Sequence, residues 1–455
     1  MIFKRKFAPR FFALMIIVCL CASTASHAVE YIRLEYPQPP MAADLAGPID
    51  FAFTDIPLSD RFLFTKQKKK LEDKPAFWRD AKFSFDLRTY HFKRYNDFDD
   101  KPKGHTFGGQ VRFESGWWKN FGIRAAYYNS RKISASGPDT GLLDEDAQDI
   151  NVLGEAAVRY RITDTILDGS VIDLGRQTMN LPYMNKLDIR QVPSAHEAYL
   201  ISRKDSQFDY IFGHVTKHKN YDREKFIPMS ESAGAEDSNK GVSVIGARLP
   251  LHGKSSIGFG YLAGWDTFDT LYAESTYYTD FADESELRLS AQYSHQRSSG
   301  EQLVGDFSTN HFAAKGAYSW SGAILTLGGS ITGSGAQIRD PWGGNPSYLS
   351  LQRYSFNRAN EKALLFGLSW NSLYFSPLGI SSYINIVHGS DARDPLTGLD
   401  LPDRTEYDAT IDYKPPEGFL EGLWVRARYN FVEVKGDNEN VRDLRLILNY
   451  TLPFL

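Results

Sequence analysis

From residue 83 to the C-terminus, apolar and polar residues alternate in one short segment after another. In the last of these segments the two parities separate cleanly, with Leu444, Leu446, Leu448, Tyr450, Leu452 and Phe454 on one and Asp443, Arg445, Asn449 and Thr451 on the other. Successive side chains of a β-strand point to opposite faces, so this pattern predicts strands with one apolar and one polar face. About eighteen such segments can be drawn, which predicts an all-β fold.

The same separation is clear in residues 107–117, 150–162 and 423–431. In residues 150–162 the apolar parity is predicted to hold Ile150, Val152, Ala156, Val158, Tyr160 and Ile162, and the polar parity Asn151, Glu155, Arg159 and Arg161. Aromatic residues make up 14% of the chain, and such residues are enriched in strands. The longest apolar run, at residues 11–22, is too short for the roughly 20 residues of a membrane-spanning helix. A polytopic helical membrane protein is therefore excluded.

The first 28 residues have the organisation of a secretory signal peptide. A basic stretch that contains Lys4 and Arg10 precedes the apolar run, and Ser26-His27-Ala28 offers a cleavage site. Both cysteines, Cys19 and Cys21, fall inside this segment, so the mature chain is predicted to contain no disulfide. Removing four basic and no acidic residues changes the net charge from −4 to −8, which does not favour nucleic acid as a partner.

Residues 29–81 lack a strand period, because prolines at 37, 39, 40, 48 and 57 interrupt them. We expect this segment to be a periplasmic tether or N-terminal extension. The basic run Lys66-Gln67-Lys68-Lys69-Lys70 is expected to be a solvated stretch of that tether. A docking site for anionic polymer or lipid head groups is the alternative.

Residues 82–455 are predicted to form a transmembrane antiparallel β-barrel of about 18 strands, of the outer-membrane porin type. Closure removes the exposed sheet edges that an exported all-β chain of this size would otherwise have to protect. Short connections such as residues 319–322 alternate with long ones such as 217–240 and 332–362. Short turns are expected on the periplasmic side and long loops outside. A barrel this wide leaves an aqueous lumen, so diffusion of a solute is the expected function.

Several fragments resemble the OprD-type substrate-specific porins in their order and approximate spacing. They are Arg112-Phe113-Glu114-Ser115-Gly116, Thr140-Gly141-Leu142-Leu143, Gly175-Arg176-Gln177 with Leu181-Pro182, Asp188-Ile189-Arg190-Gln191-Val192-Pro193, and Phe356-Asn357-Arg358-Ala359-Asn360-Glu361-Lys362-Ala363. The stretch from Phe85 to Phe92 looks like the first strand of that family. The resemblance implies an eighteen-stranded barrel, a constriction formed by inward-folded loops, and basic residues that lead carboxylate-bearing small molecules through it. The expected partners are such solutes, outer-membrane lipid and lipopolysaccharide, and the expected state is a monomer or a loose homotrimer.

The polar parity of the clearer strands independently predicts a basic lumen. The inward basic residues would be Arg88, Arg112, Arg159, Arg161, Arg248, Arg288, Arg426, Arg428 and Arg445, and the inward acidic ones Asp86, Glu114, Glu155 and Asp443. Arginine presents planar donors that suit a carboxylate and stays charged, so an excess of arginine in a pore favours anions. The alternative is that these arginines only solvate the lumen or pair with neighbouring acids.

Asp188, Arg190 and Pro193 lie in a stretch without a strand period between two predicted strands. The family resemblance places this stretch at the constriction, with Arg190 facing the solute and Asp188 either orienting Arg190 or contacting a cationic end of the solute. A structural salt bridge in a loop is the alternative. Arg176 and Arg358 lie in other matching motifs and are weaker candidates for the solute path.

Enzyme chemistry finds little support in the sequence. His214 and His218 are four residues apart and would share one face of a strand, but nothing nearby completes a metal site. No G-x-S-x-G nucleophile motif occurs. We therefore predict a channel with no catalytic residues, no metal and no cofactor, and keep a barrel-borne enzyme or surface-binding protein as the alternative.

Overall fold

The computed structural model describes residues 64–96, 102–136, 140–204, 208–281, 285–374, 376, 378–416, 420–436 and 440–453. The predicted signal peptide and residues 29–63 of the predicted tether lie outside these residues. Among the helices of the described residues, none has the length and apolar character needed to cross a membrane.

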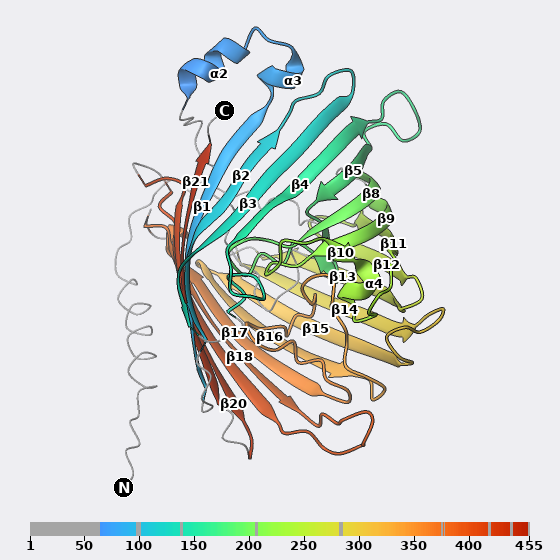
Figure 1. Cartoon of the computed structure of the whole chain (residues 1–455). Coiled ribbons are helices and arrows are strands. Elements are labelled where there is room, and N and C mark those ends of the chain that lie inside the picture. The colour runs from blue at the N-terminus through green and yellow to red at the C-terminus, as the bar shows by residue number, and fades with distance from the viewer. Residues whose placement is uncertain are drawn as a thin grey trace.

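Eighteen strands form one closed antiparallel barrel, which confirms the predicted fold class (Figure 1). They are β1 (Lys82–Asn96), β2 (Lys103–Glu114), β3 (Phe121–Ser136), β4 (Ile150–Arg161), β5 (Val171–Gln177), β8 (Ala195–Arg203), β9 (Asp209–Lys219), β11 (Val242–Pro250), β12 (Ser256–Gly264), β13 (Phe268–Asp280), β14 (Glu286–Ser298), β15 (Ser308–Trp320), β16 (Ala323–Thr332), β17 (Lys362–Asn371), β18 (Ile380–Ser390), β19 (Arg404–Tyr413), β20 (Leu423–Val434) and β21 (Val441–Pro453). The barrel closes where β1 pairs with β21, from Ser84 opposite Pro453 to Asn96 opposite Val441.

Shorter elements lie before β1 and in the connections. They are the helices α2 (Thr65–Leu71), α3 (Ala76–Arg79) and α4 (Met229–Ser232), the 3-10 helix η2 (Ser372–Tyr374), and the strands β6 (Asn180–Leu181), β7 (Met184–Asn185) and β10 (Ile227–Pro228). The helix α3 lies against the turn between β2 and β3, where the Gly116 N–H donates to the carbonyl of Phe77 (2.9 Å). A Cβ on Gly116 would lie 2.0 Å from the carbonyl oxygen of Ala76, so only glycine permits this approach. The basic run of the predicted tether lies on α2.

The alternation places apolar side chains on the outer surface of the barrel. In β17, Leu364, Phe366 and Leu368 are exposed while Ala363 and Leu365 are buried. Large apolar side chains are exposed in the same way along most strands. A continuous apolar surface of this kind is stable in lipid rather than in water.

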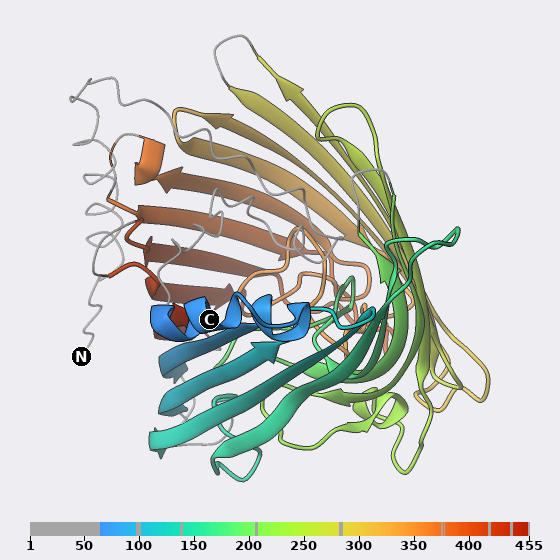
Figure 2. The same ribbon diagram turned by 90° about the horizontal axis from the view of Figure 1, so that it is seen from above.

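All long connections leave the barrel at the end opposite to the start of β1 and the end of β21. The longest join β5 to β8 (residues 178–194), β9 to β11 (220–241) and β16 to β17 (333–361). They fold into the barrel, and Figure 2 shows their coils inside the ring of strands. Met184 and Trp342 of these connections share one buried cluster with Val244, Leu262 and Tyr272 of the wall. This cluster fills one side of the interior.

One predicted parity is wrong at the start of β4. Ile150 and Val152 were predicted to share the apolar outer face with Val158, but they are 0% and 8% exposed and pack against Val192 of the β5–β8 connection. The register explains the change, because Glu155 pairs with Ala126 while Leu153 pairs with Tyr127, which leaves Gly154 as an extra residue. Such a β-bulge reverses the parity of the residues before it.

Candidate functional site

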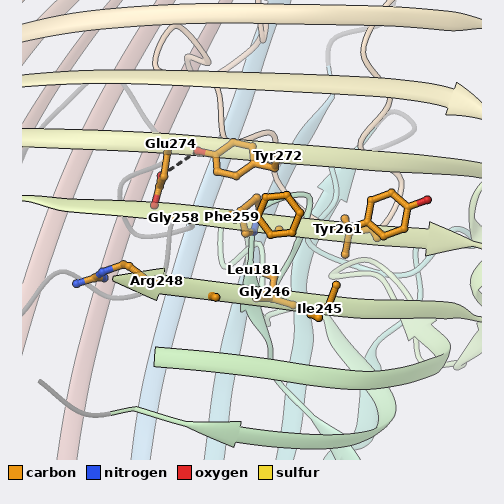
Figure 3. A pocket seen from close by; sticks show the side chains of 13 residues that line it. Leu181, Ile245, Gly246, Arg248, Gly258, Phe259, Tyr261, Tyr272 and Glu274 are labelled. Atoms are coloured by element: carbon orange, nitrogen blue, oxygen red, sulfur yellow. Dashed lines mark hydrogen bonds between the residues drawn. The ribbon is translucent and has the colours of Figure 1, made fainter. Parts of the chain in front are cut away.

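The β5–β8 connection crosses the interior and is held at both of its sides. On one side, the β6–β7 hairpin places Leu181 against the barrel wall at Gly246, where a Cβ would lie 3.9 Å from Leu181 Cδ2 (Figure 3). Because glycine has no side chain, the wall is hollow at this point and receives the leucine. Tyr183 of the same hairpin donates a buried hydrogen bond from its hydroxyl to Ser294 Oγ (2.6 Å) of β14.

On the other side, residues 188–191 are fixed to β1 and β2. Arg88 of β1 donates to Asp188 through both terminal nitrogens (2.6 and 3.2 Å) and to the carbonyl oxygen of Arg190 (2.5 Å). The hydroxyl of Tyr90 donates to the carbonyl of Ile189 (3.2 Å), and the side chain of Gln191 donates to the Arg88 carbonyl (2.8 Å). The connection therefore spans the lumen from β11–β14 to β1–β2.

Asp188 remains about one quarter exposed while it is paired with Arg88. Burial alone would raise the pKa of the Asp188 carboxyl, but the charge and hydrogen bonds of Arg88 outweigh burial and hold the pKa below its ordinary value of 3.8. Lys186 and Arg112 act in the same direction. Asp188 is thus ionised at neutral pH, and Arg88 rather than Arg190 is its partner.

The Arg190 side chain lies among the loops. It is 9% exposed, and its Nε donates to the carbonyl of Thr140 (3.2 Å). Its guanidinium carbon lies 5.2 Å from the ring centroid of Phe92 and 5.8 Å from that of Tyr221. These contacts connect three elements: β1, the β3–β4 connection and the β9–β11 connection. A direct contact between Arg190 and a solute stays a prediction.

The inner wall of β2, β3 and β4 carries arginines that pair with carboxylates, and Arg112 lies above the buried Glu155. The Arg112 side chain is 40% exposed, whereas its partner Glu155, at 3.4 Å, is 1% exposed. Arg124 approaches the same Glu155 (4.0 Å) and also Glu114 (3.9 Å). Arg159 forms ion pairs with Glu114 and with Asp173 (3.1 Å).

A second arginine lies above a buried carboxylate between β20 and β19. Arg426 forms two hydrogen bonds to Asp412 (2.6 and 2.9 Å), and its side chain is 19% exposed while that of Asp412 is 0% exposed. Arg428 donates to the hydroxyl of Tyr383 (3.1 Å). Arg445 is buried and pairs with Asp443 (3.1 Å).

The remaining candidates are Arg161, Arg176 and Arg358. Arg161 is exposed near the short turns, where its guanidinium carbon lies 5.0 Å from the Trp117 ring. Arg176 pairs with Glu197 (3.6 Å) and lies over Phe226 (4.4 Å), and it does not join the Asp188 group. Arg358 binds Glu361 (2.7 Å) within the β16–β17 connection. Whether each of these lies on a solute path stays a prediction.

Several residues that face inward in the structure were not predicted from the sequence. Arg124 was not among the predicted inward residues. The alternation of the apolar residues Phe121, Ile123 and Tyr127 with it nevertheless indicates that Arg124 faces inward. The acidic face of β19 was also omitted, although it can be read from the alternation of polar and apolar residues. This face consists of the buried residues Glu406, Asp408, Thr410 and Asp412. The inward surface is therefore richer in acids than the clearer strands indicated.

His214 and His218 lie on different faces of β9. His214 and His218 were predicted to share a face, but Thr216 is a bulge residue between the paired positions Val215 and Lys217, and this separates them. His218 is buried and stacks on His196 (4.9 Å between ring centroids), whereas His214 lies beside the exposed Trp265. Among the described residues, no group of three or more His, Cys, Asp or Glu could hold a metal ion.

Comparisons with known proteins agree with this architecture. The family model described as outer membrane porin, OprD family, matches residues 75–454. Pseudomonas aeruginosa OccK9 (OpdG) superimposes with a TM-score of 0.76 at 18% identity, covering 83% of this chain and 100% of that chain. P. aeruginosa OpdK, solved with vanillate, gives 0.73 at 18% identity over 83% of this chain and 100% of that chain. P. aeruginosa OccK2 (OpdF), solved in complex with glucuronate, gives 0.71 at 18% identity over 84% and 100%.

A search of curated proteins finds no match to this chain. The family match covers far more than half of the chain, and it includes all eighteen strands of the barrel. The chain therefore belongs to the OprD family of outer membrane porins.

Proposed function

We propose that this porin conducts small solutes that carry a carboxylate, by passive and selective diffusion along its arginine-bearing inner wall. The observation that carries the proposal is the layering of Arg112 over Glu155 and of Arg426 over Asp412. In both pairs the arginine side chain is more exposed (40% for Arg112 and 19% for Arg426) than the carboxylate beneath it (1% for Glu155 and 0% for Asp412). A solute that passes this wall meets the cation first.

The buried carboxylates support selectivity in a second way. Each one fixes its arginine by hydrogen bonds or charge, so little side-chain entropy is lost when a solute binds. Each one also neutralises part of the arginine's charge, which keeps binding weak. A channel needs such a balance, because a site that holds its solute firmly blocks conduction.

The ligands of the relatives favour the same class of solute. Vanillate and glucuronate, which were bound in the solved structures of OpdK and OccK2, are both carboxylates. At 18% identity these structures support the chemical class of the solute and not its identity.

Liposome permeation can test the proposal with a matched pair of solutes, an aromatic monocarboxylate and its uncharged amide. We expect the wild type to pass the carboxylate faster, and Arg112→Gln to reduce the carboxylate-to-amide ratio about five-fold, the effect of one nearby charge in an aqueous pore. Arg393→Gln is the control, because Arg393 is an exposed arginine of the β18–β19 connection that pairs with Asp400. A wild-type ratio near one, or equal ratios for wild type and Arg112→Gln, would contradict the proposal.

A further inference from the structure

Four basic residues gather on the outer face of neighbouring strands at the end with the long loops. Lys93 of β1 lies directly opposite Lys103 of β2, Arg442 of β21 lies opposite Tyr95, and Arg131 of β3 lies opposite Phe107. Their parity is that of the exposed, lipid-facing side chains Tyr95, Phe107 and Leu446. We call these four residues the outer basic cluster, and Figure 1 shows β21, β1, β2 and β3 side by side.

The outer basic cluster is not neutralised by the described part of the chain. Among the described residues, no carboxylate forms an ion pair with Lys93, Lys103, Arg131 or Arg442. Lys93 Nζ instead lies 4.2 Å from the ring centroid of Tyr95, and the Arg442 guanidinium carbon lies 5.2 Å from that of Phe431. Two like charges directly opposite on neighbouring strands repel each other. The inward arginines differ, because most of them have a carboxylate partner.

The height of the cluster corresponds to a membrane interface. Lys93 lies eleven residues beyond Lys82, the first residue of β1. At about 3.3 Å per residue and a tilt of about 40°, this corresponds to roughly 28 Å along the barrel axis. The apolar band of such barrels is about 25 Å tall, so the cations lie just above it on the side of the long loops.

An apolar hollow lies on the same outer face below the cluster. It measures about 310 Å³, and its lining includes Leu87, Thr89, Phe107, Leu423, Leu448 and Tyr450. Its upper residue on β1, Thr89, is four residues from Lys93, a distance of about 13 Å along the strand. A lipid whose head group binds the cations could place an acyl chain in this hollow.

We propose that the outer basic cluster and this hollow bind one lipopolysaccharide molecule of the outer leaflet, with its phosphates on Lys93, Lys103 and Arg442 and an acyl chain against Phe107 and Leu448. The position at the long-loop end favours this lipid over the phospholipids of the inner leaflet. A phosphorylated lipid relieves the repulsion between the two lysines, and its binding does not depend on which solute the pore conducts.

Lipopolysaccharide binding to the purified barrel in detergent tests the proposal. The variant Lys93→Gln, Lys103→Gln, Arg442→Gln removes three cations, and Lys119→Gln, Lys254→Gln, Arg393→Gln removes three cations elsewhere. At about five-fold per cation near an anionic lipid surface, we expect the first variant to bind about 100-fold more weakly and the second to bind like the wild type. Wild-type barrel should bind dephosphorylated lipopolysaccharide as weakly as the first variant binds the intact lipid.

Three results would overturn the proposal. The first is equal affinity of wild type and the cluster variant. The second is an equal loss in both triple variants. The third is an affinity for phosphatidylglycerol equal to that for lipopolysaccharide. Heat-modifiable mobility in electrophoresis shows whether each variant has a folded barrel.

Discussion

Replacing Arg88 by Ala should detach residues 188–191 from the barrel wall. Arg88 binds the Asp188 carboxylate, the Arg190 carbonyl and the Asn449 side chain, and these contacts are 2.5 to 3.2 Å long. Removing one partner of a buried pair costs about 3–5 kcal/mol, and the partial exposure of Asp188 reduces this to about 2–3 kcal/mol. The fraction of time for which this segment is detached should rise about 30- to 150-fold.

Hydrogen exchange of the amides of residues 186–194 measures this change directly. Arg94→Ala is a matched control, because Arg94 lies on the same strand and forms a comparable ion pair with Asp443. The control should accelerate exchange near β21 and leave residues 186–194 unchanged. Adding Asp188→Asn to Arg88→Ala should restore part of the protection by removing the unpaired carboxylate. Unchanged exchange of residues 186–194 in Arg88→Ala would refute the reasoning.

Three further predictions follow from the loops. Gly246→Leu should expel Leu181 from the wall at an overpacking cost of about 1–3 kcal/mol and accelerate hydrogen exchange of residues 179–185. The control Ile245→Leu, at an outward-facing position, should leave this exchange unchanged, and equal protection of residues 179–185 in both variants would contradict the packing of Leu181 on Gly246. The pKa of Asp188 is depressed, so its ion pair with Arg88 stabilises the attachment of residues 186–194 fully above the ordinary pKa and is lost as the pH falls through the lower folded value. Protection of residues 186–194 from hydrogen exchange should therefore be constant from about pH 8 to pH 5 and fall below about pH 4, and Asp188→Asn should abolish that fall. Burial raises the pKa of Asp340 to about 6, so protonation of Asp340 stabilises the folded loop at lower pH and this stabilisation is lost as the pH rises through 6. Hydrogen exchange of residues 333–361, corrected for the intrinsic rate, should be slower at pH 5 than at pH 7 in wild type and equal at the two pH values in Asp340→Asn.

The strands could be predicted because their pattern is local. Each of the eighteen segments with a two-residue period is a strand of the barrel, and the inward parity of Arg426, Arg428 and Arg445 was predicted correctly. Errors arose at single-residue irregularities. Gly154 and Thr216 each add one residue to a strand and reverse the parity on one side of it, and the alternation itself does not reveal such an insertion.

The partners of the loop residues could not be predicted. Asp188 and Arg88 are 100 residues apart in the sequence, and their contact depends on how the β5–β8 connection crosses the barrel. The packing of Arg190 between Phe92 and Tyr221 depends on two loops that have no periodic pattern. The buried carboxylates beneath Arg112 and Arg426 depend on the pairing register, because Glu155 and Asp412 lie on other strands.

The reversal potential of single channels in a salt gradient at low ionic strength tests the central claim most directly, because screening of the wall charges is weakest there. An arginine-lined path predicts that the wild type prefers anions. It also predicts that the reversal potential shifts toward cation preference in the double variant Arg112→Gln, Arg426→Gln. A clear cation preference in the wild type, or the same reversal potential in wild type and double variant, would contradict it.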